Sequence, residues 1–247
     1  MFARRQLGLT DPLLDVRLFK NRAFTAAALT TLMAMLAIGA ALFLMSLRCV
    51  HGYSPFEAGL RTLPAAIATL VGSLPTPWLM EWIGPRAVIA LGLGGLVAGF
   101  LVLAPAPEPT TYAYVAVVLV TLGLGDGLAI TTSASVLVSA VPAVPAERAG
   151  QAGAVSETNF ELGVGLGVAL LGSIHGAVYV SHVPGQPQLA RESIGGAHEL
   201  ARTAGGRVMD AAQAAFDSAL TTTAYVSVGI VGTVTLLVVW PVPRGLR

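Results

Sequence analysis

The sequence predicts an all-α integral membrane protein with six transmembrane helices, and three observations support this fold class. Of the 247 residues, 55% are hydrophobic and only 11% are charged, whereas an average soluble domain carries about 25% charged residues. The mean hydropathy is +0.75. Charges are also absent from six long runs, each about as long as a helix that crosses roughly 30 Å of hydrocarbon. Together these observations exclude a soluble enzyme.

The six charge-free runs give the order of the predicted helices. They are Ala23–Leu47, Thr62–Met80, Ala87–Pro107, Pro109–Ala146 (interrupted by Asp126 alone), Leu162–Ala190 and Ser218–Pro243. We place the fourth helix at Tyr112–Val138, and we expect the fifth to begin near Gly150. The runs lack the polar stripe of helices in a soluble bundle and the alternating segments of a membrane barrel.

The remaining segments complete the predicted organisation. Residues 1–22 form a polar cytoplasmic lead-in or linker, residues 23–243 form the six-helix membrane unit, and residues 244–247 form a cytoplasmic tail. A long external loop covers about residues 181–217, and its stretch Val208–Phe216 is predicted to be helical and to lead into the last span. Three prolines interrupt the second span and favour a kink there, because each removes a backbone donor. They are Pro64, Pro75 and Pro77.

The distribution of Lys and Arg predicts the orientation, since cytoplasmic ends of spans carry the excess of these residues. With a cytoplasmic N-terminus, nine fall on the cytoplasmic side: Arg4, Arg5, Arg17, Lys20, Arg22, Arg86, Arg148, Arg244 and Arg247. Five fall outside: Arg48, Arg61, Arg191, Arg202 and Arg207. We therefore predict a multi-pass protein of the cell membrane, with both termini cytoplasmic and the lipid bilayer as its partner.

Several function classes have no support in the composition. The formal net charge is +1, which gives no attraction to nucleic acid. Cys49 is the single cysteine, so an internal disulfide and a cysteine metal cluster are excluded. The histidine spacing predicts no metal site, and no set of nucleophile, base and partner suggests an enzyme. We expect no cofactor.

Asp126 is the clearest candidate for function. It lies in the segment Gly123–Gly127, near the middle of the fourth predicted helix. A carboxylate at membrane depth is costly, and removal from water favours its neutral form, so it could take up and release a proton. In the alternative reading, the carboxylate is structural and hydrogen-bonds to Thr131, Thr132 or another helix.

Three further ionisable residues are candidates for proton or substrate binding. Glu157 and Glu161 are four residues apart, so they share one face of the fifth helix. They either repel in a poor dielectric, with at least one partly protonated, or lie solvated at the cytoplasmic mouth or paired with Arg148. Arg61 begins the second helix, where it either extends towards lipid headgroups or pairs with a buried carboxylate.

Three pairs of glycines have the spacing that places both residues on one helix face. They are Gly95/Gly99, Gly123/Gly127 and Gly163/Gly167. Such pairs let two helix backbones approach closely. We expect packing contacts here, with sliding or rocking faces as the alternative.

The segment Pro77–Arg86 resembles the cytoplasmic loop motif of the major facilitator superfamily. Leu79, Gly84 and Arg86 match the motif, Glu81 replaces its aspartate, and Pro77 replaces its leading glycine. The resemblance implies that the acid and base of this loop, Glu81 and Arg86, make a contact that helps to hold the outward-facing state.

A wider resemblance covers nearly the whole chain. Pro12–Arg22, Ala58–Pro64 and Gly153–Gly163 are similar to the final six helices of the fourteen-helix drug:proton antiporters of the EmrB/QacA type. This similarity implies a six-helix unit that forms one half of a major facilitator fold, without the N-terminal half.

The resemblance implies the C-terminal half of a proton-coupled multidrug exporter. It would use the proton gradient to export small amphipathic or cationic drug-like compounds. In this superfamily a path runs between two halves, so we expect the chain to need an N-terminal half-transporter or a second copy. The alternative is a non-transporting membrane remnant or interaction protein.

Overall fold

The computed structural model describes residues 21–49, 55–105, 111–140, 146–183 and 206–239, and these are almost entirely helical. The helices are α2 (Arg22–Cys49), α3 (Pro55–Ser73), α4 (Thr76–Ile83), α5 (Pro85–Leu103), α6 (Tyr112–Ala140), α7 (Ala146–Leu166), α8 (Gly172–His182) and α11 (Gly206–Val239). A π-helical turn, η2 (Gly167–Leu171), joins α7 to α8. The predicted lead-in, most of the external loop and the C-terminal tail lie outside the described residues.

The membrane prediction is confirmed by the length and composition of these helices. Five are long and apolar enough to cross a membrane: Arg22–Leu44, Pro85–Leu103, Tyr112–Ser139, Ser156–His182 and Asp210–Val238. Helices α3 and α4 make a sixth candidate span that is bent by 44°. The protein is therefore an all-α, multi-pass membrane protein.

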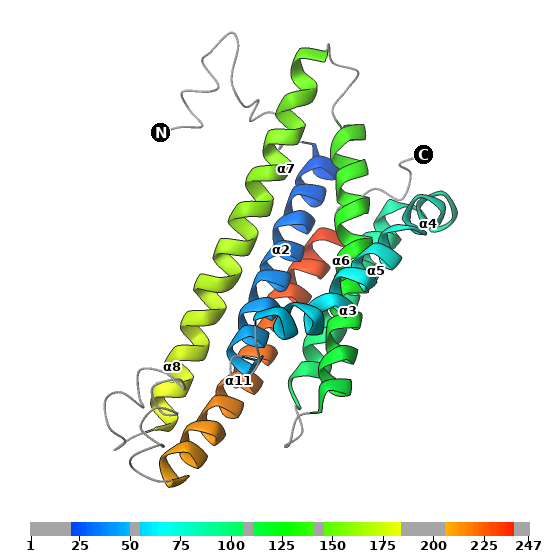
Figure 1. The fold of residues 1–247 in the computed structure, drawn as a ribbon. Helices are drawn as coiled ribbons and strands as arrows, with labels where there is room; N and C mark the ends of the chain where they lie inside the picture. The colour runs from blue at the N-terminus through cyan, green and yellow to red at the C-terminus, as the bar shows by residue number, and fades with distance from the viewer. Residues whose placement is uncertain (1–20, 50–54, 106–110, 141–145, 184–205, 240–247) are drawn as a thin grey trace, which may run out of the picture.

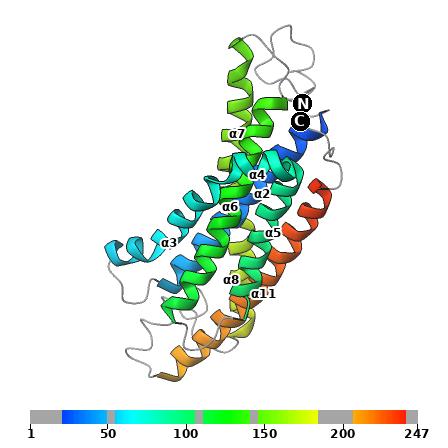
Figure 2. The same ribbon diagram turned by 90° about the vertical axis from the view of Figure 1, so that its right-hand side faces the viewer.

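Successive spans alternate in direction, so the described ends, Arg22 and Val239, lie at the same end of the bundle (Figure 1). Helices α7, η2 and α8 form one long rod beside α2. Helix α3 leans away from the other spans at its beginning (Figure 2). The main core joins α2, α5, α6, α8 and α11, and α2 is the most buried of the candidate spans.

The bend between α3 and α4 follows from the local sequence. Pro75 precedes α4 and Pro77 lies in its first turn, whereas Pro64 is accommodated inside α3. Because proline donates no backbone hydrogen bond, the helix stops at Ser73. The Thr76 hydroxyl donates to the Gly72 carbonyl across the break, at 3.0 Å. The predicted kink is thus present, and a side chain satisfies part of the interrupted backbone.

Glycines set the closest helix contacts. A Cβ atom at Gly123 would lie 2.5 Å from the Ala65 carbonyl oxygen, and one at Gly127 would clash with the Thr69 carbonyl. On the other flank of α6, a Cβ at Gly125 would lie 2.7 Å from the Gly92 carbonyl oxygen of α5. Gly163 of α7 and Gly167, the first residue of η2, bring these segments equally close to α2. All three predicted glycine pairs therefore lie at helix contacts, because Gly95 and Gly99 face α6.

Hydrogen bonds between helices complete the packing at the end of α5. The Thr221 hydroxyl of α11 donates to the Ala104 carbonyl at 2.8 Å, and the Tyr114 hydroxyl of α6 donates to the Val102 carbonyl. The last carbonyls of a helix have no partner within that helix. Side chains of α6 and α11 supply partners for two of them, where lipid could not.

We predict that Gly163→Val destabilises the fold by about 1–3 kcal/mol, the usual cost of overfilling a packed contact. A Cβ at Gly163 would lie 2.5 Å from the Met35 Cβ and 2.6 Å from the Leu32 carbonyl oxygen. The matched control is Gly165→Val in the same helix, where nothing lies within 4 Å of the added Cβ. Unfolding by dodecyl sulfate in mixed micelles, followed by circular dichroism, measures the difference. Equal stability of the two variants would contradict the packing described.

Candidate functional site

Asp126 lies at the middle of α6 and is almost fully enclosed, with 4% of its surface exposed. The side chain of Thr69, on α3, lies close enough to the carboxyl group to favour its charged form. The carboxyl oxygen Oδ1 has no hydrogen-bond partner. A buried acceptor without a partner is costly, so Oδ1 is the place in α6 where a proton or a donor group would be most favourable.

The glycines around Asp126 explain why α3 reaches it. Gly123 and Gly127 face α3, while Gly125 faces α5, so α6 is held between two closely approaching helices. Gly127 lies against the backbone of Thr69, the residue whose side chain lies beside the Asp126 carboxyl group. The glycine-rich segment thus places the carboxylate and its partner together.

Thr69 was not predicted as the partner of Asp126. Our structural alternative named Thr131, Thr132 or another helix, and Thr69, on α3, is the side chain that lies beside the carboxyl group. The Thr132 hydroxyl donates to the Leu128 carbonyl of its own helix at 2.7 Å. The sequence contains one usable signal, because Thr69 is the polar residue within the apolar stretch Ala65–Val71, but it does not show which helix that residue faces.

Glu157 and Glu161 take no part in the contact around Asp126. Both are exposed on α7, a helix that packs along α2, and they share one face as predicted. Glu157 lies at the start of the apolar span Ser156–His182, and Glu161 lies one turn deeper. Both alternatives for these glutamates, repulsion in a poor dielectric and solvation at the cytoplasmic mouth, stay predictions. The side chain of Arg148 lies outside the described residues.

Arg61 places its guanidinium over the ring of Tyr112, with 5.2 Å between Cζ and the ring centroid. This cation–π contact joins the beginnings of α3 and α6. Arg61 precedes Thr69 by eight residues of helix, or about 12 Å. Arg61 therefore stabilises the beginning of α3, far from α4. It does not reach the Asp126 carboxylate.

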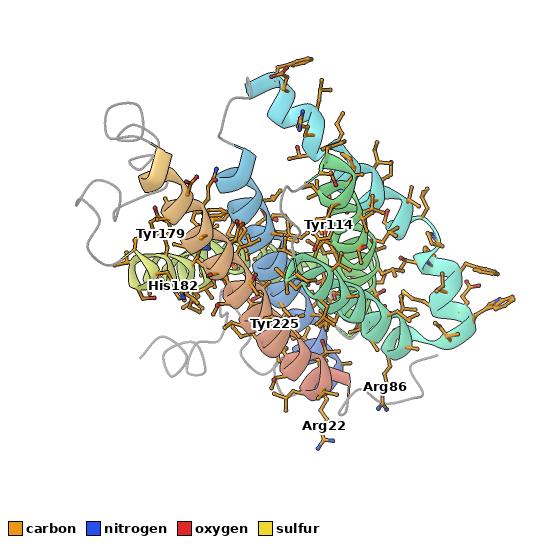
Figure 3. The ribbon with its side chains drawn as sticks, turned by 90° about the horizontal axis from the view of Figure 1, so that it is seen from below. Arg22, Arg86, Tyr114, Tyr179, His182 and Tyr225 are labelled. Atoms are coloured by element: carbon orange, nitrogen blue, oxygen red, sulfur yellow. The ribbon has the colours of Figure 1, made fainter. Side chains whose placement is uncertain are left out.

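The motif residues of Pro77–Arg86 form a helix and a turn where we predicted a loop. Leu79 and Glu81 lie on α4, half-buried and exposed respectively. Gly84 has a φ of 80°, a conformation that glycine adopts without strain, and it alone separates α4 from α5. Arg86 lies in the first turn of α5, and its side chain extends outward on the same side of the bundle as Arg22 (Figure 3).

His175 shows how a polar group is packed elsewhere in the bundle. It is 5% exposed and contacts the edge of the Phe216 ring, with 4.9 Å between centroids, and its Nδ1 atom has no hydrogen-bond partner. Among the described residues, no three His, Cys, Asp or Glu side chains come together as they would for a metal ion.

Comparison with known proteins adds a family to this geometry. Residues 4–168 match the model of the Major Facilitator Superfamily. The chain belongs to this superfamily. The six-helix arrangement is consistent with one half of a major facilitator fold.

Relatives of this major facilitator chain carry names of efflux and resistance proteins. Multidrug efflux pump LfrA of Mycolicibacterium smegmatis is 35% identical over 94% of the chain, and the match covers 48% of LfrA. Methyl viologen resistance protein SmvA of Salmonella typhimurium is 31% identical over 87% of the chain and 46% of SmvA. Multidrug resistance protein Stp of Mycobacterium tuberculosis is 34% identical over 67% of the chain. The chain spans about half the length of LfrA and SmvA.

We predict that Thr69 and Asp126 are energetically coupled by about 0.5–3 kcal/mol, the range for residues in direct contact. A double-mutant cycle of Thr69→Val and Asp126→Ala, measured by unfolding in mixed micelles, gives the coupling free energy. The control pairs Asp126→Ala with Thr223→Val, because the Thr223 hydroxyl donates to the Ala219 carbonyl of its own helix. Additive effects in the Thr69 cycle would show that the two side chains do not interact.

Proposed function

We propose that the chain is the C-terminal half of a proton-coupled multidrug efflux transporter of the fourteen-helix drug:proton antiporter type. It would export small amphipathic or cationic compounds across the cell membrane, with both termini in the cytoplasm. The names of LfrA, SmvA and Stp support the substrate class. The match to about half of LfrA and SmvA supports a half-transporter.

The observation that carries the proposal is the buried Asp126 carboxyl with one oxygen unpartnered. In a poor dielectric, the charge of this group is too costly to be retained without compensation. Protonation removes the charge, and an approaching cation compensates it. A proton and a cationic compound therefore compete for the same group, and each changes which arrangement of the surrounding helices is favoured.

Two helices expose surfaces of different kinds, and only one of them needs the remaining half. Helix α3 exposes a row of large apolar side chains that includes Leu63, Ile67 and Leu70. Helix α7 exposes Glu157 and Glu161 within or beside its apolar span. Lipid can cover the first row but not two carboxylates. We therefore propose that an N-terminal half-transporter, or a second copy, encloses a water-filled path against α7.

The test of transport is flux in reconstituted vesicles under an imposed proton gradient, with methyl viologen as the transported cation. We predict coupled uptake of methyl viologen and release of protons when the chain is combined with the part of LfrA that it does not match. Asp126→Asn should reduce both fluxes about tenfold or more, because an amide cannot accept the proton. Asp210→Asn, at an exposed position of α11, is the matched control and should transport normally.

Two results would contradict the proposal in different ways. Unchanged proton flux in the Asp126→Asn variant would remove Asp126 from the proton path. Coupled transport by the chain alone as a monomer would show that it is not half of a transporter. Loss of transport in the Asp210→Asn variant as well would point to a general defect of folding.

For the glutamates of α7 we predict a different effect. The double variant Glu157→Gln/Glu161→Gln should raise the KM for methyl viologen severalfold while protons remain coupled to transport, since exposed carboxylates attract the cation without carrying the proton. The rate measured over a range of methyl viologen concentrations, with the proton-to-substrate ratio at each, separates the two effects. A changed ratio would assign proton transfer to these glutamates.

A further inference from the structure

Helix α4 presents two different faces. On its inner face Thr76 is fully buried, and Met80 packs against the cluster that contains Phe24. On its outer face Trp78 and Trp82 are 55% and 72% exposed, and the exposed Glu81 lies between them in the sequence. The outer face therefore combines two large aromatic rings with one carboxylate.

The two tryptophans form a preorganised pair. Their ring centroids are 4.4 Å apart, and the ring planes are inclined by 40°. Each indole has an apolar body and one N–H donor, which suits a boundary between hydrocarbon and water. The pair continues the apolar row of α3, because Leu74, at the break, is 71% exposed.

The length of α3 determines where α4 lies relative to the bilayer. Helix α3 has 19 residues and is therefore about 28 Å long, close to the thickness of the hydrocarbon core. After the break at Leu74 and Pro75, α4 departs by 44° from the direction of α3. Because α3 leans away from the other spans (Figure 2), its length is an upper limit on the depth that it crosses before α4 begins.

Charged residues mark the same end of the bundle as a membrane surface. Helix α4 lies at the end of the bundle where α2 begins and α11 ends (Figures 1 and 2). Arg22 and Arg86 extend outward at this end (Figure 3). Arginine side chains at the ends of spans reach the headgroup region.

We propose that α4 lies in the headgroup layer of the bilayer, with Trp78 and Trp82 inserted at the boundary between headgroups and acyl chains. The carboxylate of Glu81 distinguishes this position from two others, the hydrocarbon core and a dry contact with another protein. In hydrocarbon the carboxylate would be costly, which disfavours a position of α4 in the middle of the bilayer. In a dry contact with another protein it would need a partner, whereas at the headgroup layer it meets water.

This anchor has a structural role in the bundle. It fixes the depth of the Gly84 turn and of Arg86, the residues that connect α4 to α5. The proposal rests on the membrane-spanning fold and does not depend on any transported compound.

The test uses the full chain in phosphatidylcholine vesicles and the fluorescence of single tryptophans. Trp240→Phe combined with Trp82→Phe leaves Trp78 alone, and Trp240→Phe with Trp78→Phe leaves Trp82 alone. A matched reference replaces all three tryptophans by Phe and introduces Ile67→Trp. Ile67 belongs to the exposed apolar row of α3, near the middle of that helix, and is 58% exposed. Circular dichroism of each variant confirms that it is folded before quenching is measured.

We expect Trp78 and Trp82 to be quenched more strongly by lipids brominated near the headgroup than by lipids brominated near the chain ends, and partly by aqueous iodide. The Ile67→Trp reference should show the opposite preference for brominated lipids and no quenching by iodide. Stronger quenching of Trp78 and Trp82 by the deeply brominated lipids would place α4 in the hydrocarbon and overturn the proposal. Quenching by iodide alone would place α4 in water, and protection from both quenchers would place it against protein; either result also overturns it.

Discussion

The structure depends on how closely helix backbones approach one another. Inside a bilayer, the surrounding lipid is as apolar as the side chains, so burial from water gives little attraction between helices. The attraction between helices must come from van der Waals packing, and glycine allows two helix backbones to approach most closely. Helix α6 uses this on two flanks, with Gly123 and Gly127 against α3 and Gly125 against α5. The same approach positions Thr69 beside Asp126, so the packing and the candidate site have one physical cause.

The glycine contacts also show an order in the arrangement of the spans. Helix α6, the first of the last three spans, packs in parallel against α3, the second of the first three. Helix α2, the first span, packs in parallel against α7, the second of the last three. In each contact, the first span of one group of three packs against the second span of the other group. This agrees with the repeats of three helices within each half of a major facilitator, although the sequence shows no clear internal repeat.

The sequence predicts the spans well because hydrophobic length is a local property. The fourth helix was predicted at Tyr112–Val138 and extends over Tyr112–Ala140. Pro75 and Pro77 predict the kink for an equally local reason. The partner of Asp126 could not be predicted, since Thr69 is distant in sequence and only the packing of α3 on α6 brings it close. Similarly, Gly84 belongs to a recognisable motif, but its φ of 80° and the helix before it depend on how α4 lies on the bundle.

The π-turn η2 explains how the long rod of α7, η2 and α8 keeps one side turned towards the rest of the bundle. Gly163, Gly167, Leu171, His175 and Tyr179 are all buried, at strict intervals of four residues. In an uninterrupted α-helix with about 100° per residue, each such interval would advance the row by about 40° around the axis, or about 160° in all. The wider turn at Gly167–Leu171 accommodates one additional residue and cancels much of that drift. Deletion of a single residue from the turn would therefore restore an uninterrupted α-helix, with His175 and Tyr179 still facing the bundle and Gly163 still in place against α2.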